Sequence, residues 1–118
     1  MLNRIQKHTI SFKHAFRGIG IAVKTQPNFQ IHLIAAMLVL VAGWKYDLSG
    51  AEWAIILFTI LWVLLTEMIN TALESIVDLI TLEYRETAKT AKDVAAGAVL
   101  LGAIGSIIIA LLIFIPKL

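Results

Sequence analysis

The sequence predicts an all-α integral membrane protein with three transmembrane helices and an N-terminal amphipathic helix on the membrane surface. Hydrophobic residues make up 59% of the 118 residues, and the mean hydropathy is +0.87. A soluble domain of this size has too much surface to bury that much apolar material. Three long stretches without charged residues follow a basic segment that contains no acid. We therefore expect a single membrane domain over residues 1–118.

The first expected element is the surface helix, residues 1–26. Its large apolar residues recur at helical spacing: Phe12, Phe16, Ile19 and Val23. Its basic residues are Arg4, Lys7, Lys13, Arg17 and Lys24. An apolar row with basic residues turned away from it is typical of a helix that lies on a membrane. Pro27 should end this helix, because proline cannot continue one.

The three uncharged stretches predict transmembrane helices over residues 29–47, 51–82 and 90–115. A helix needs roughly 20 apolar residues to cross a bilayer. The second helix is longer than this, so its C-terminal end should project into the aqueous interface. The small residues along the third helix predict close packing between helices, as in an oligomer.

Basic residues near the ends of the spans predict the orientation of the chain. Five precede the first span, only Lys45 lies in the first loop, and Arg85, Lys89 and Lys92 lie in or just after the second. We therefore expect a multi-pass protein of the inner (cytoplasmic) membrane with a cytoplasmic N-terminus. The net charge of +2 is too small to indicate nucleic-acid binding, and the absence of cysteine excludes thiolate metal sites.

A polar stripe follows the apolar part of the second span, in the segment EMINTALESIVD at residues 67–78. At about 100° per residue, Glu67, Asn70, Glu74 and Asp78 fall within about 80° of arc on one helix face. Glu67 is expected to lie deepest in the membrane and Asp78 nearest to water. Lys92 and Asp93, at the start of the third span, lie across a short loop from Asp78 and are expected to join its wet end.

This layout suits phosphoryl transfer from a donor in water to an acceptor in the bilayer. Mg²⁺ is usually held by one or two carboxylates together with phosphate oxygens. A carboxylate at membrane depth can accept a proton from a lipid hydroxyl. The alternatives are an ion- or proton-conducting protein, with Glu67, Glu74 and Asp78 as a relay, and a purely structural subunit. The acids cluster at one end of the span, which weakens the relay hypothesis, and a structural subunit leaves a buried Glu67 unexplained.

The chain resembles the prokaryotic diacylglycerol kinase family of small integral-membrane lipid kinases. The resemblance depends on E-x-x-N-T-A-L-E-x-x-V-D at 67–78, E-Y at 83–84 and A-K-D-x-A-A-G-A-V-L at 91–100. The stretches SFKHAFRGIG, NFQIH and FIPKL are similar to the undecaprenol kinase branch. The resemblance implies a homotrimer with active sites shared between subunits. It also implies phosphorylation of a lipid alcohol, undecaprenol or diacylglycerol, with ATP and Mg²⁺.

The resemblance further implies roles for individual residues. Glu67 matches the catalytic base, and Asn70 belongs to the same catalytic motif. Glu74 matches a metal ligand, and Gln26 stands where relatives carry a second metal-binding glutamate. A glutamine offers a carbonyl oxygen without charge, so we expect weaker metal binding at this position. Four further residues match positions that contact the nucleotide: Lys7, Asp78, Lys92 and Asp93.

Overall fold

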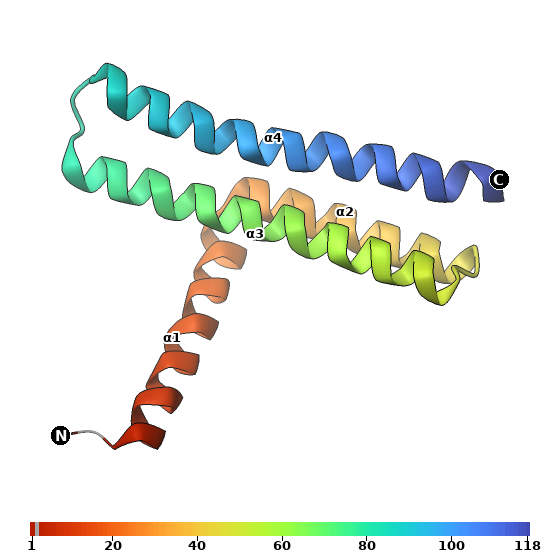
Figure 1. The fold of residues 1–118 in the computed structure, drawn as a ribbon, viewed down its shortest axis with the longest axis horizontal. Coiled ribbons are helices and arrows are strands. Elements are labelled where there is room, and N and C mark those ends of the chain that lie inside the picture. Colours follow the sequence, from red (N-terminus) through yellow and green to blue (C-terminus); the bar gives the residue numbers. More distant parts are fainter. Residues whose placement is uncertain (2) are drawn as a thin grey trace.

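The computed structural model describes residues 1 and 3–118, and this part of the chain is all-α (Figure 1). The elements are α1 (Arg4–Thr25), α2 (Pro27–Lys45), α3 (Gly50–Ile80), α4 (Glu86–Phe114) and the short 3₁₀ helix η1 (Ile115–Lys117). Three helices are long and apolar enough to cross a membrane: α2, α3 and α4 with its η1 extension. The predicted all-α membrane fold with three spans is therefore confirmed.

Local sequence signals explain where the helices begin. Asn3 with Gln6 at α1, and Ser49 with Glu52 at α3, form capping boxes, in which side chains satisfy free backbone N–H groups at the helix start. Pro27 is the first residue of α2, where its missing N–H costs nothing. The predicted break at this proline is present, and Gln26 alone separates α1 from α2.

The helix bounds differ from the predicted spans mainly around the loop between α3 and α4. α3 stops at Ile80 because Thr81 is extended and its hydroxyl accepts a hydrogen bond from the Glu83 N–H at 3.1 Å. α4 begins at Glu86, ahead of the predicted start at residue 90. Charged residues mark where a helix should leave the bilayer, but a helix of good formers continues past that boundary.

α3 is the central helix of the bundle, and α2 and α4 both pack against it in antiparallel directions (Figure 1). Gly43 lies so close to Trp53 that a Cβ added to Gly43 would be 2.8 Å from the indole Cη2 atom. Counting along both helices from this contact at about 1.5 Å per residue brings Phe29 level with Glu67. Residues 71–80 of α3 therefore extend beyond α2 and have α4 beside them.

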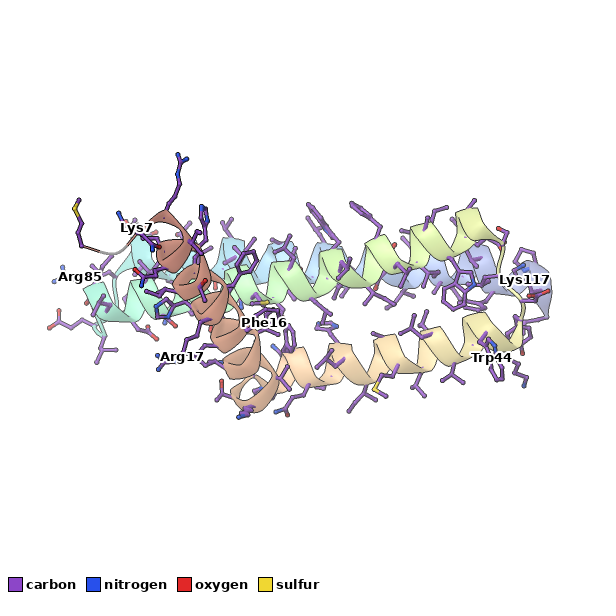
Figure 2. All side chains as sticks on the ribbon, turned by 90° about the horizontal axis from the view of Figure 1, so that it is seen from below. Lys7, Phe16, Arg17, Trp44, Arg85 and Lys117 are labelled. Carbon is purple, nitrogen blue, oxygen red and sulfur yellow. The ribbon has the colours of Figure 1, made fainter. Side chains whose placement is uncertain are left out.

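The two ends of the bundle differ. At the end that holds the C-terminus, Lys117 Nζ lies 3.0 Å from Glu52 Oε2, and the Tyr46 and Phe114 rings meet edge to face at 6.1 Å. These contacts fix α4 against the turn between α2 and α3. Arg85 marks the opposite end (Figure 2). α1 leaves the bundle sideways at the start of α2, inward of this second end, and packs mainly against α2 (Figure 1).

Few side chains are buried, as expected for a chain with helices that can cross a membrane. The buried apolar residues are Ala22, Phe29, Ala36, Leu48, Ile56, Val63 and Ala95. Among the residues that the structure describes, the buried polar ones are Glu67 and Asn70. Both belong to the stripe that the sequence singles out, so the polar part of the core coincides with the candidate site.

Candidate active site

The predicted polar stripe is present on α3 and changes from buried to exposed along the helix. Glu67 is 2% exposed and Asn70 is 7% exposed. Glu74 is half-buried and Asp78 is exposed. This gradient follows from the length of α3: Glu67 is level with the start of α2, whereas Glu74 and Asp78 lie beyond it. The stripe therefore connects the interior of the bundle to its charged end.

Two oxygens of the stripe are buried without a hydrogen-bond partner, Glu67 Oε2 and Asn70 Oδ1. The other polar atom of Asn70, Nδ2, donates to Glu74 Oε1 at 3.2 Å. A buried acceptor without a donor costs about 1–3 kcal/mol. Both atoms are acceptors when Glu67 is ionised, so they cannot satisfy one another. The pair fits a ligand that brings a hydrogen-bond donor to this depth.

The exposed end of the stripe borders a charged pocket, which we call the α3–α4 pocket. Lys92 Nζ lies 2.5 Å from Asp78 Oδ1, joining α4 to α3, and Lys89 Nζ lies 2.5 Å from Asp93 Oδ2. The pocket has a volume of about 320 Å³. Its charged lining residues are Asp78, Glu83, Arg85, Lys89, Lys92 and Asp93. The lining thus holds three cations, each paired with an acid, and a ligand that carries several phosphates can take the place of an acid beside these cations.

Two predicted site residues, Gln26 and Lys7, are far from the stripe in sequence, and they differ in how near the structure brings them to it. Gln26 is half-buried, and its Nε2 donates to Thr25 Oγ1 at 3.2 Å, so its carbonyl oxygen is the atom available to a cation. It precedes Phe29 by about one turn and so lies near the depth of Asn70. Lys7 is exposed toward the free end of α1, which runs away from α3 and α4 (Figures 1 and 2). A single chain therefore does not bring Lys7 to the stripe.

The available donors suit Mg²⁺ as a partly protein-bound ion. No group of three or more acidic, histidine or cysteine side chains in the described part of the chain could hold a metal by itself. Glu74 contributes a half-buried carboxylate and Gln26 a neutral oxygen, and Mg²⁺ commonly takes one or two carboxylates with water and phosphate oxygens. The residues fit the metal if a nucleotide supplies the remaining ligands.

The structure adds pocket residues that the sequence assigned to other roles. The sequence predicts that Arg85 and Lys89 determine membrane orientation, yet both also line the α3–α4 pocket together with Tyr84. The spacing of Lys89 and Asp93 places them on one face of α4, and this i,i+4 pair is the sequence signal that could have indicated their proximity. Tyr84 had no such signal beyond its place in the E-Y pair.

Comparison with known proteins identifies the family of this chain. Residues 13–114 match the family model for prokaryotic diacylglycerol kinase. The chain is 48% identical to the undecaprenol kinase of Bacillus subtilis over 116 residues, which cover 98% of this chain and 94% of that protein. It is 42% identical to the diacylglycerol kinase of Synechocystis over 110 residues, 92% of this chain and 63% of that protein. Identity to the Escherichia coli K12 diacylglycerol kinase is 27% over 95 residues, 80% of this chain and 78% of that protein. The chain belongs to the prokaryotic diacylglycerol kinase family.

Proposed function

We propose that this protein is an ATP-dependent lipid kinase that transfers the γ-phosphate of ATP to the primary hydroxyl of undecaprenol. The family and the relatives support a lipid kinase over the ion-conducting alternative. The observation that carries the proposal is the buried, unpartnered carboxylate oxygen of Glu67, on the same helix face as Asp78, which lines a pocket of three cations and three acids. A lipid hydroxyl supplies the donor that this oxygen lacks.

Glu67 acts as the general base in this proposal. Its Oε2 accepts the hydroxyl proton of the lipid while the lipid oxygen attacks the γ-phosphorus of ATP, and the bond from that phosphorus to the bridging oxygen of ADP breaks. General-base catalysis of this kind contributes typically 10²–10⁴-fold. Asn70 holds Glu74 through its amide and presents Oδ1 to the same buried space. Its role is to orient the groups around the hydroxyl.

The nucleotide occupies the exposed end of the stripe. Lys92 exchanges its contact with Asp78 for a phosphate oxygen, and Asp78 and Asp93 contact the nucleotide from the two helices. Glu74, assisted by the neutral oxygen of Gln26, would hold Mg²⁺, which when bound neutralises charge on the transferring phosphoryl group. Because Gln26 carries no charge, we propose that the site binds Mg²⁺ less tightly than it would with a second carboxylate at this position.

The choice of undecaprenol over diacylglycerol is supported by the similarity to the Bacillus protein, which covers nearly the whole chain. The stretches that resemble this branch lie at both ends of the sequence, in α1, α2 and η1. Both substrates present a primary hydroxyl at the interface, so the catalytic groups accommodate either one. The hydrocarbon parts of undecaprenol and diacylglycerol differ, so the membrane-facing surface of the protein must distinguish between them.

We further propose a homotrimer in the inner membrane, with a cytoplasmic N-terminus and active sites shared between subunits. The remote position of Lys7 supports sharing, because another subunit's α1 can bring its lysine to the stripe. The small side of α4 supports close assembly: Gly102, Gly105 and Ser106 form an apolar groove of about 520 Å³ with Phe58 and Trp62 of α3. A neighbouring helix fits such a groove.

The proposed activity is tested with the purified protein in bilayers that contain undecaprenol and diacylglycerol together, supplied with ATP labelled at the γ-phosphate. Label on undecaprenol is the expected result. Label on diacylglycerol alone would keep the kinase and overturn its substrate. Absence of labelled lipid, with proton flux into liposomes that lack ATP, would replace the kinase with the ion-conducting alternative.

Sharing is tested by mixing inactive subunits. Glu67→Gln subunits mixed with Lys7→Ala subunits should recover part of the activity, since some sites then combine an intact stripe with an intact α1. The matched control mixes Glu67→Gln with Asn70→Ala subunits. Both changes lie on the same stripe, so no site in that mixture is complete. Equal activity in the two mixtures would show that each subunit works alone.

A further inference from the structure

A cavity lies between the three spans, and none of the residues assigned above to the reaction lines it. α2 and α4 both run alongside α3 (Figure 1), and the cavity between them has a volume of about 160 Å³. α3 lines it from Ile56 to Leu64, while α2 and α4 contribute Ala36 and Ser106 among others. The cavity therefore begins about one turn from Glu67 and reaches about 16 Å from it along the axis of α3.

The cavity is on the same side of α3 as the polar stripe. At about 100° per residue, Ile56, Val63 and Glu67 fall within about 40° of arc, and all three are buried. Side chains on a helix tilt toward its N-terminus, so the carboxylate of Glu67 is directed toward the turn of Val63, which lines the near end of the cavity. Its Oε2 is buried without a hydrogen-bond partner. A lipid whose hydroxyl meets this oxygen has the cavity beside the carbons that follow the hydroxyl.

The polar side chains of the cavity leave its deeper part without a free hydrogen-bond donor. Thr59 Oγ1 donates to a carbonyl of its own helix at 2.7 Å, and Ser106 Oγ does the same on α4 at 2.7 Å. Each hydroxyl has a single O–H to donate. The third polar residue of the lining, His32, is half-buried and lies one turn beyond Phe29, which is level with Glu67. Beyond His32, the cavity suits a hydrocarbon.

We propose that this cavity receives the isoprene unit next to the hydroxyl of undecaprenol, and that Ala36 is the residue that makes room for it. The inference rests on the kinase activity proposed above. Apolar cavities of about 150 Å³ stay dry and bind benzene, and an isoprene unit has one carbon fewer than benzene. Ala36 is 8% exposed, so a larger side chain at this position would enter the cavity that it lines.

The structure of each lipid next to its hydroxyl explains why the cavity selects undecaprenol. Undecaprenol continues from its hydroxyl as a single hydrocarbon chain. Diacylglycerol carries an ester-linked chain on each of the two glycerol carbons that follow its hydroxyl carbon, and a cavity of about 160 Å³ cannot hold both chains. Burying an ester carbonyl without a donor is also unfavourable. Diacylglycerol therefore keeps its chains outside the cavity and gains no binding energy from it.

The test measures transfer of labelled phosphate to undecaprenol and to diacylglycerol, each offered alone in phosphatidylcholine bilayers. One methylene too many in an apolar pocket changes kcat/KM by about 10–200-fold, so Ala36→Leu should lower kcat/KM for undecaprenol at least about tenfold. Transfer to diacylglycerol should be unchanged. Ala110→Val narrows the same cavity from α4 and should have the same effect to a smaller degree. The control Val41→Phe adds bulk on the outer side of α2, where Val41 is 64% exposed, and should change neither activity.

Binding is measured separately as the rise in unfolding temperature that each lipid produces, because a ligand that binds the folded state stabilises it. Undecaprenol should raise the unfolding temperature of the unmodified protein more than that of Ala36→Leu or Ala110→Val. The unfolding temperature without lipid reports whether each variant is folded.

The outcomes separate this inference from the proposed function. Unchanged transfer to undecaprenol and unchanged binding in Ala36→Leu and Ala110→Val would overturn the cavity assignment and leave the kinase activity in place. Equal losses with both lipids in the folded variants would overturn it too, because the cavity would then not select between them. Absence of transfer to undecaprenol by the unmodified protein would refute the proposed substrate itself.

Discussion

Replacing Glu67 by glutamine separates its proposed catalytic role from its place in the core. The substitution keeps the size of the side chain and removes the proton acceptor. Turnover should fall by about 10²–10⁴-fold, which corresponds to about 3–5 kcal/mol of transition-state stabilisation. ATP binding should persist, because the α3–α4 pocket begins at Val77, well beyond Glu67 along α3.

The same substitution should leave the fold intact or make it more stable. In the native protein, Asn70 Oδ1 is buried without a donor. Side chains three residues apart on a helix have Cβ atoms about 5–6 Å from one another, so the amide of Glu67→Gln can donate to that oxygen. Satisfying a buried acceptor is worth about 1 kcal/mol. We expect the free energy of unfolding to rise by about this amount while activity is lost.

The assay combines transfer of labelled phosphate to undecaprenol in bilayers with equilibrium unfolding in detergent. Glu52→Gln is the matched control, because it makes the same chemical change on the same helix. It removes the ion pair with Lys117, but glutamine can still complete the capping box with Ser49. It should lower stability slightly and leave turnover unchanged. A Glu67→Gln protein with turnover within about threefold of the unmodified protein would refute the general-base assignment. Lost turnover with equally lost stability would instead make Glu67 a structural residue.

Four further outcomes are expected. Glu74→Ala should abolish phosphate transfer even at high magnesium. Glu74→Asp should regain part of the activity with Mn²⁺, which also takes carboxylate oxygens. Both outcomes are measured by titrating the activity with the metal. Gln26→Glu should lower the magnesium concentration that gives half-maximal activity, because it adds a charged ligand. Lys92→Gln should raise the KM for ATP about tenfold and change stability by less than about 1 kcal/mol, since its ion pair is exposed. Gly43→Ala should lower the free energy of unfolding by about 1–3 kcal/mol, because its Cβ would meet the indole ring of Trp53 at 2.8 Å. Gly97→Ala should raise the free energy of unfolding by about 1 kcal/mol, because its Cβ would have nothing within 4 Å and alanine is the better helix former.

Each of these outcomes has a result that contradicts it. Ordinary magnesium dependence in Glu74→Ala would remove that residue from the metal site. An unchanged titration in Gln26→Glu would mean that the position does not face the metal. A Lys92→Gln protein with normal KM and poor stability would make the lysine a structural link between α3 and α4. Equal stability changes in the two glycine variants would show that the contact at Gly43 is not tight.

The stripe illustrates what sequence periodicity determined. The spacing of Glu67, Asn70, Glu74 and Asp78 places them on one face of any helix, whatever packs around it. Pro27 likewise fixed the boundary between α1 and α2, and apolar length fixed three spans, because backbone groups in lipid must be satisfied within each helix. These features depend on residues close in sequence, so the amino-acid sequence alone is enough to predict them.

Tertiary structure decided which of these polar groups remain unsatisfied and which meet a partner. Packing against the other helices buries Glu67 and Asn70 at one end of the stripe. It also leaves one oxygen of each residue without a hydrogen-bond donor. The pairing of Lys92 with Asp78 likewise depends on the register between two antiparallel helices, which the sequence of either helix alone does not specify. The distance of Lys7 from the stripe depends on the direction in which α1 leaves the bundle (Figure 1). Register and direction are set by contacts between residues far apart in the chain, and local patterns carry no information about them.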